Sequence, residues 1–125
     1  MKLEKVLLVY QFRNCDAHKI AKKVLKQNSV NYKSINRTRM KTGKNEGVDL
    51  VIAIGGDGTF LRTSHFIKDS TPILGMNANP KKKVGFFLRC SAHDFETKLK
   101  KILRNKHKLL KLSRLKCELN KKVLP

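Results

Sequence analysis

The sequence predicts an α/β fold: an open, doubly wound, mostly parallel sheet, followed by the opening strand of a second, all-β domain. Three observations predict it. Continuous apolar runs, typical of strands buried on both faces, alternate with amphipathic helical segments. Glycines follow the run at 48–54, where the binding crevice of such a sheet is expected. Near the C-terminus the pattern changes to alternation with a period of two, which indicates an antiparallel strand.

The sequence of residues 6–35 predicts a strand, a helix and a second strand. The run VLLVY at 6–10 is apolar and rich in strand-forming residues. The segment 16–28 carries an apolar stripe at helical spacing, with Asp16 able to cap its start and Asn28 able to end it. A second strand is predicted at 30–35. The apolar stripe of the helix consists of Ala17, Ile20, Ala21, Val24 and Leu25.

The middle of the chain holds the predicted central strand. The stretch 36–47 is polar, basic and aperiodic, which predicts a mobile loop. The run VDLVIAI at 48–54 is nearly continuous in apolar residues, as expected of the strand at the centre of the sheet. A helix is expected after the glycines that follow, as far as about Ile67. A third buried strand is predicted at 71–77.

The segment 91–105 is the clearest helix in the sequence. Ser91 and Asp94 form an S-x-x-D capping box, which marks a helix start. Apolar residues then recur at helical spacing, so this helix has one face to bury. That face consists of Phe95, Leu99, Ile102 and Leu103.

The tail differs from everything before it. Apolar and polar residues alternate at 109–120, as in a strand with one wet face. A single strand cannot bury itself or satisfy its own edges. We therefore predict an α/β domain at 1–107, which carries the glycines after the run at 48–54, and the start of a truncated all-β domain at 108–125.

The charge of the chain is strongly positive. Its 125 residues include 29 Lys and Arg against 9 Asp and Glu, a formal net charge of +20. Such a field attracts nucleic acid, anionic membranes or polyanionic substrates, although a solvated lysine-rich surface explains it equally well. No segment approaches the roughly 20 apolar residues that span a membrane. We expect a soluble, cytoplasmic protein without a membrane partner.

Cysteines and histidines give no sign of a metal site. The cysteines are far apart and form no CxxC pair, which argues against structural zinc and a disulfide framework and fits a reducing compartment. The histidines show no metal-ligand spacing. These residues are Cys15, Cys90, Cys117, His18, His65, His93 and His107.

The sequence GGDGT, Gly55–Thr59, follows the predicted central strand. Its glycines would let a nucleotide approach backbone N–H groups at a helix N-terminus. Asp57 would repel phosphate there unless it accepts a proton from an attacking hydroxyl or helps to hold a divalent cation, and both roles belong to phosphoryl transfer. The motif lacks the lysine of a Walker loop and the third glycine of a dinucleotide fingerprint. The segment after it does not alternate, which argues against a hairpin turn.

Three motifs in order make a family resemblance. AIGGDGTFLR, then PILGMN and then VGFF resemble the NAD kinase family, whose hallmark is GGDGT after a hydrophobic strand, a strand ending in G-x-N, and a G-F turn. The resemblance covers essentially the whole chain. Diacylglycerol and sphingosine kinases share GGDGT, but their helix with Asn and Glu and their later G-T-x-N-D-F segment are missing here. Phosphofructokinases carry a related GGDGS in a different context.

The resemblance implies an activity and its partners. Members transfer the terminal phosphate of ATP, or of polyphosphate in some, to the 2′-hydroxyl of the adenosine ribose of NAD, with a divalent metal that is normally Mg²⁺. Asp57 would orient or deprotonate that hydroxyl. A second domain, with an Asn-Glu motif, would complete the NAD site and much of a homo-oligomer interface, so this chain alone is expected to be weak or inactive. The implied nucleotide-binding residues are Gly55, Gly56, Asp57, Gly58, Thr59, Arg62, Asn77 and Phe86.

Several of these residues have plainer interpretations. Arg62 either binds a phosphate or is a solvated helix arginine, and Phe86 either lines an adenine pocket or packs in the core. Asn77 either binds the nucleotide or braces a turn. Lys81–Lys83 lie in a link that departs from the family pattern, and they either meet phosphates or form a flexible surface loop.

Two other functions stay open. One is a lipid kinase of the diacylglycerol type, which shares GGDGT and would use the basic surface at a membrane. The other is a nucleic-acid binder that uses the basic segment from Lys98 onward. Few aromatic residues and no nucleic-acid-binding motif argue against the second.

Overall fold

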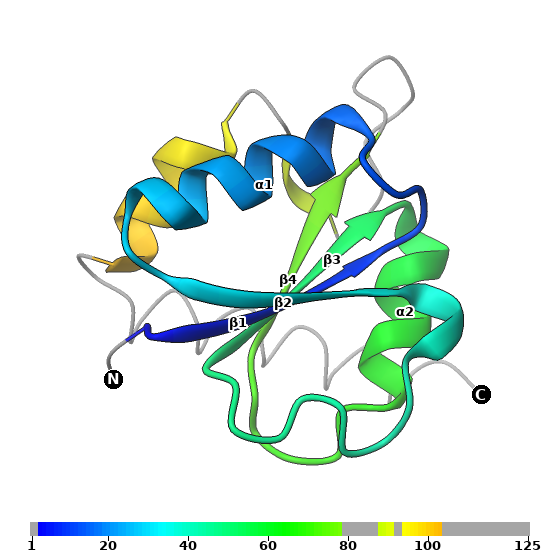
Figure 1. The fold of residues 1–125 in the computed structure, drawn as a ribbon. Helices are drawn as coiled ribbons and strands as arrows, with labels where there is room; N and C mark the ends of the chain where they lie inside the picture. Colours follow the sequence, from blue (N-terminus) through cyan, green and yellow to red (C-terminus); the bar gives the residue numbers. More distant parts are fainter. Residues whose placement is uncertain (1–2, 79–87, 92–93, 104–125) are drawn as a thin grey trace.

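A computed structural model describes residues 3–78, 88–91 and 94–103 of the chain (Figure 1). Its five strands form one sheet in the order β2-β1-β3-β4-β5, and every neighbouring pair is parallel. The strands are β1 (Lys5–Tyr10), β2 (Asn31–Asn36), β3 (Leu50–Gly55), β4 (Ile73–Asn77) and β5 (Leu88–Ser91). The helices are α1 (Asp16–Gln27) and α2 (Asp57–His65), with a 3-10 turn η1 (Arg37–Arg39) and a further helical segment at 95–103.

The sheet separates two layers of helix. In Figure 1, α1 and the helical segment 95–103 lie on one side of the sheet, and α2 lies on the other. Alternate strand residues face the two layers: Leu8 and Ile52 belong to the core cluster beneath α1, whereas Leu7 and Val51 belong to the cluster with α2. The open, doubly wound, parallel sheet predicted from the sequence is therefore confirmed.

The ends of α1 differ from the prediction at one terminus. Its N-cap residue is Cys15, which makes no side-chain capping bond, and Asp16 lies in the first turn, so the prediction that Asp16 caps the helix is wrong. Instead, Nδ1 of His18, a residue within the helix, accepts a hydrogen bond from the backbone N–H of Asn14 at 2.9 Å, so this N–H just before the helix has a partner. Asn28 is the C-cap residue as predicted, and its Nδ2 donates to the carbonyl of Val24 at 2.8 Å.

The segment 36–47, which the sequence predicted as a mobile loop, is anchored to the fold by side-chain packing and hydrogen bonds. It contains η1, and the side chain of Met40 is buried in the core cluster with α2. The buried Asn45 donates from Nδ2 to the carboxylate of Asp69 at 3.0 Å and to Oγ1 of Thr71 at 2.9 Å. These anchors join residues more than twenty positions apart, so local composition does not predict them.

The helical segment 95–103 follows a strand, β5, that the sequence did not predict. β5 has four residues, and its pairing with β4 shifts register between Gly75 and Met76. Half of the predicted capping box is present, since the carboxylate of Asp94 accepts the backbone N–H of Ser91 at 2.6 Å. The predicted apolar face packs under the sheet as expected, with Phe95, Leu99, Ile102 and Leu103 in or against the core cluster of α1. The strand predicted at 109–120 and the domain boundary at 107 lie outside the described residues.

His18 joins α1 to the first two strands. Its ring stacks on Tyr10 of β1, with the ring centroids 4.5 Å apart, and Nε2 lies 2.6 Å from Oγ of Ser34 on β2. Because Nδ1 accepts the N–H of Asn14, the proton of the neutral ring is on Nε2 and is donated to Ser34. Burial, and then the nearby charges of Lys22 and Arg13, lower the pKa of His18 from 6.5 to about 4.

This pKa predicts a pH-dependent stability. Between pH 6.5 and about 4 the unfolded chain protonates His18 and the folded chain does not, so the free energy of unfolding falls as the pH falls. We expect a loss on the order of 2 kcal/mol across this window that is absent in His18→Gln. Urea unfolding at several pH values measures it. The exposed His65 supplies the control, and a His65→Gln variant that flattened the profile equally would contradict the assignment.

Candidate functional site

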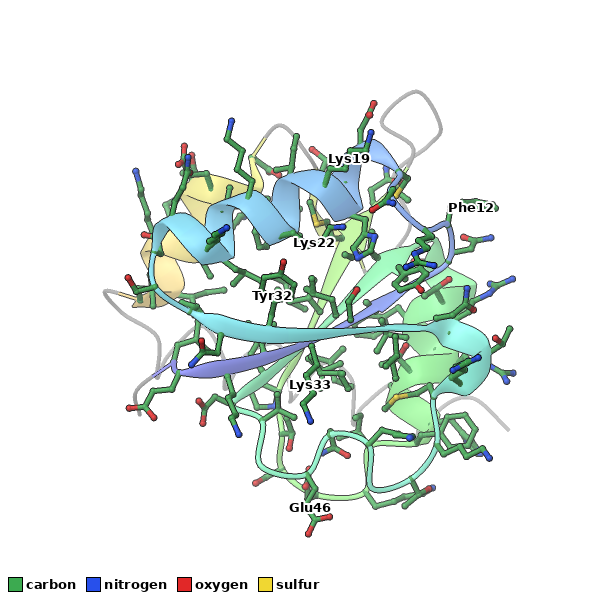
Figure 2. All side chains as sticks on the ribbon, in the orientation of Figure 1. Phe12, Lys19, Lys22, Tyr32, Lys33 and Glu46 are labelled. Atoms are coloured by element: carbon green, nitrogen blue, oxygen red, sulfur yellow. The ribbon has the colours of Figure 1, made fainter. Side chains whose placement is uncertain are left out.

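The carboxyl ends of β1 and β3 form the topological switch point of the sheet. The two strands are neighbours, but the chain leaves β1 through α1 toward β2 and leaves β3 through α2 toward β4. The two connections therefore diverge onto opposite faces, and ligands of open parallel sheets bind in the crevice between such connections. The segment after β1 begins at Gln11 and includes the exposed Phe12, which points away from the fold in Figure 2.

GGDGT forms the end of β3 and the first turn of α2. Gly55 is the last residue of the strand, Gly56 is the N-cap residue of α2 in extended conformation, and Asp57 begins the helix. Helix formation starts within the motif rather than after it, since the N–H of Phe60 already bonds to the carbonyl of Gly56 at 3.2 Å. The N–H groups of this first turn lack carbonyl partners within α2, which makes the turn suited to an anion.

The glycines of the motif have different surroundings. A Cβ on Gly55 would lie 2.5 Å from Oγ1 of Thr59 and 3.0 Å from Oε1 of Gln11. Gly55 therefore lets α2 begin close against the end of β3. Within the described part of the chain, a Cβ on Gly56 or Gly58 would meet nothing within 4 Å. These two glycines leave open space above the turn, where a ligand can approach the backbone.

Asp57 is half-buried in the first turn of α2. The partial positive charge of a helix N-terminus stabilises a carboxylate in this position. The same N–H groups that suit this turn to an anion can therefore stabilise the negative charge of Asp57. A carboxylate in this place can accept a proton from a hydroxyl or share a cation with a phosphate.

Thr59 and Arg62 connect α2 to the turn after β2. Thr59 is 1% exposed, and its Oγ1 accepts a hydrogen bond from Nη1 of Arg37 at 3.3 Å. Arg62 is exposed, donates from Nε to the carbonyl of Arg37 at 3.1 Å, and lies 5.9 Å from the centre of the Phe66 ring. The sequence reasoning missed Arg37. Its signal was its position two residues after the strand predicted at 30–35, at the edge of the sheet that carries the glycines, although the sequence pattern assigned it to a mobile loop at 36–47.

Asn77 lies beside Gly55, where the motif begins. It is the last residue of β4, is buried, and pairs in register with Gly55. The N–H of Ala78 bonds to the carbonyl of Gly55 at 3.1 Å, so the chain after β4 is tied to the end of β3. The predicted candidates Phe86 and Lys81–Lys83 lie outside the described residues.

Other reactive groups in the described part of the chain do not form a second site. No group of three or more His, Cys, Asp or Glu side chains is placed there to hold a metal ion. Burial raises the pKa of the Cys90 thiol to about 12, so this cysteine stays protonated and unreactive. Among the same residues, no helix has the length and apolar character to cross a membrane.

Comparison with known families gives the ancestry of this site. The profile of the ATP-NAD kinase N-terminal domain matches residues 1–107. The chain belongs to this family. The family resemblance inferred from GGDGT and the two following motifs is thereby confirmed, and nothing in the comparisons favours a lipid kinase.

Relatives of the ATP-NAD kinase family occur in plants, bacteria and archaea. A probable NADH kinase of Oryza sativa is 33% identical over 95% of this chain and 42% of its own length, and an NADH kinase of Arabidopsis thaliana is 33% identical over 94% of the chain and 43% of its length. An NAD kinase of Flavobacterium psychrophilum is 37% identical over 68% of the chain and 30% of its length. The chain thus spans less than half the length of these relatives.

A solved structure supports the same fold. The NAD kinase of Archaeoglobus fulgidus, solved in complex with ATP, superimposes with a TM-score of 0.67 at 28% sequence identity. The superposition covers 81% of this chain and 37% of the archaeal one. The described α/β domain therefore corresponds to a part of a longer NAD kinase fold.

The contrast between the glycines predicts opposite effects of one added methyl group. Gly55→Ala should destabilise the protein by about 1–3 kcal/mol, because the Cβ would overlap Thr59. Gly58→Ala should be neutral or stabilise by up to about 1 kcal/mol, because the site is open and alanine favours a helix. Chemical denaturation of both variants measures the difference. Equal destabilisation by both would contradict the packing described for Gly55.

Proposed function

We propose that this chain is the GGDGT-bearing part of an NAD kinase, which transfers the terminal phosphate of ATP to the 2′-hydroxyl of the adenosine ribose of NAD and forms NADP. One observation carries the proposal beyond family membership. Asp57 lies at a helix N-terminus at the switch point of the sheet, between two glycines with open space above them. This arrangement supplies an anion site and a proton acceptor in one turn.

In the proposed reaction, the 2′-oxygen of the ribose attacks the terminal phosphorus of ATP. A bond forms between this oxygen and phosphorus, the bond to the bridging oxygen breaks, and ADP leaves. The proton of the hydroxyl passes to the carboxylate of Asp57. The open positions at Gly56 and Gly58 let the nucleotide approach the N–H groups of the first turn of α2, which balance the charge of the transferred phosphate.

The residues present fit a magnesium ion that is held mainly by substrate. Mg²⁺ in kinases is bound by one or two carboxylates together with nucleotide phosphates, and Asp57 supplies a single carboxylate beside the anion site. When bound, Mg²⁺ would neutralise charge on the transferred phosphate. Polyphosphate offers the same terminal phosphate chemistry and is the second donor to test.

The remaining parts of the proposal concern the longer protein. Residues 1–125 correspond to less than half of the plant relatives. We propose that these residues alone are weakly active and that the whole enzyme is a homo-oligomer, as the family resemblance implies. We assign Phe86 to the adenine pocket and the protein to the cytoplasm. The names of the two plant relatives make NADH a second acceptor to test beside NAD.

Replacing the proposed base tests this function directly. In the full-length protein, including any sequence encoded beyond residue 125, Asp57→Asn should lower NADP formation by about 10²- to 10⁴-fold, because asparagine cannot accept the hydroxyl proton. The rate of NADP formation from NAD, ATP and Mg²⁺ is measured with an NADP-specific dehydrogenase.

Asp16→Asn is the matched control for this variant. Asp16 also lies in the first turn of a helix, so both substitutions remove the same favourable interaction with a helix N-terminus. We expect both variants to fold, and only Asp57→Asn to lose turnover. Near-normal turnover in Asp57→Asn, or an equal loss in Asp16→Asn, would contradict the role of Asp57. Absence of NADP from the unmodified protein would overturn the proposed function.

A further inference from the structure

The turn after β2 brings a second element to the edge of the sheet that carries GGDGT. Tyr10 of β1 pairs with Asn36 of β2 on one side and with Ile54 of β3 on the other. Asn36 is followed by Arg37, and Ile54 is followed by Gly55, the first residue of the motif. Arg37 therefore leaves the sheet level with the start of the motif. Figure 1 shows the turn at the end of β2 lying against α2.

Two hydrogen bonds hold Arg37 in this place. Its Nη1 donates to Oγ1 of Thr59 at 3.3 Å, and its carbonyl accepts Nε of Arg62 at 3.1 Å. Both bonds join arginine side chains to neutral oxygen atoms, a hydroxyl and a carbonyl, so neither bond reduces the positive charge. Among the described residues, the Arg37 guanidinium makes one hydrogen bond, to Thr59, which leaves most of its five N–H donors for another partner.

We propose that Arg37 binds a phosphate of the phosphate donor, and that Arg62 supports it through the Arg37 carbonyl. This inference rests on the proposed function and names a residue of the same site. A planar guanidinium binds phosphate oxygens in pairs, which suits it to this role better than the lysines of the surface. Arg37 is half-buried and fixed by its bond to Thr59, so its charge is directed by the protein rather than free in solvent.

The position of Arg37 favours the donor over the acceptor. Thr59 lies two residues after Asp57 in the same helical turn, and Asp57 is the proposed contact of the ribose 2′-hydroxyl. The transferred phosphate must meet that hydroxyl, whereas the pyrophosphate of NAD is attached at the far side of the ribose. Oγ1 of Thr59 lies 2.5 Å from the position of a Cβ on Gly55, so the Arg37 guanidinium that bonds to it is held at the glycine turn, where the transferred phosphate would meet the hydroxyl.

Binding of ATP to the full-length protein tests the inference without relying on turnover. The dissociation constant of MgATP is measured by isothermal titration calorimetry for Arg37→Ala, Arg37→Lys and the control Arg39→Ala. Arg39 lies on the same turn, carries the same charge and is exposed. We expect Arg37→Ala to weaken ATP binding by about tenfold or more, Arg37→Lys to weaken it less, and Arg39→Ala to change it less than about twofold.

Kinetics separate phosphate binding from a structural role. If the unmodified protein forms NADP, Arg37→Ala should raise KM for ATP and leave KM for NAD within about twofold. Equal ATP affinity in Arg37→Ala and Arg39→Ala would overturn the inference. An equal rise of both KM values together with a lower melting temperature would also overturn the inference, because it would indicate that Arg37 only stabilises the position of α2. ATP binding that depends on Arg37 without NADP formation would support the inference while refuting the proposed function.

Discussion

Parallel pairing of β3 with β1 on one side and with β4 on the other is the constraint on which the rest of the structure depends. Every residue of β3 is buried, and helices cover both of its faces. In parallel strands the chain must leave each strand at the same edge of the sheet. The pairing therefore gathers the segments after β1, β3 and β4 at one place. It sets Gly55 beside Asn77 and the motif across from Gln11.

The fit between Gly55 and Thr59 then fixes the direction of α2. Because Gly55 has no side chain, Thr59 in the first turn of α2 can lie directly against the end of β3. The same turn explains how a carboxylate can sit within a phosphate-binding glycine turn. A helix N-terminus stabilises negative charge on a side chain and on a bound anion alike, so the position of Asp57 in the first turn of α2 is compatible with the phosphate site that we propose there.

Patterns within a few residues predicted most of the fold. The continuous apolar runs at β1 and β3, the apolar stripe of α1 and the box at Ser91 all report local structure that the tertiary fold keeps. β5 escaped prediction because it is four residues long and pairs irregularly. The prediction that Asp16 caps α1 was wrong. The segment before α1 is instead held by His18, which bonds to the backbone N–H of Asn14 and to Ser34 of β2, and a contact with another strand cannot be predicted from the local sequence.

The candidate site was predictable where one motif carries it and not where two segments meet. GGDGT identified the turn, its glycines and Asp57, whereas Arg37 enters through a contact with Thr59 over 22 positions. The assignment of Phe86 and the all-β domain at 108–125 stay predictions, since they lie outside the described residues.

The most direct measurement is a crystal structure of the full-length protein with NAD bound. It reports where the ribose lies relative to the first turn of α2. We expect the 2′-oxygen of the adenosine ribose within hydrogen-bond reach, about 2.6–3.2 Å, of a carboxylate oxygen of Asp57. NAD bound with this hydroxyl turned away from Asp57, or bound at another edge of the sheet, would contradict it.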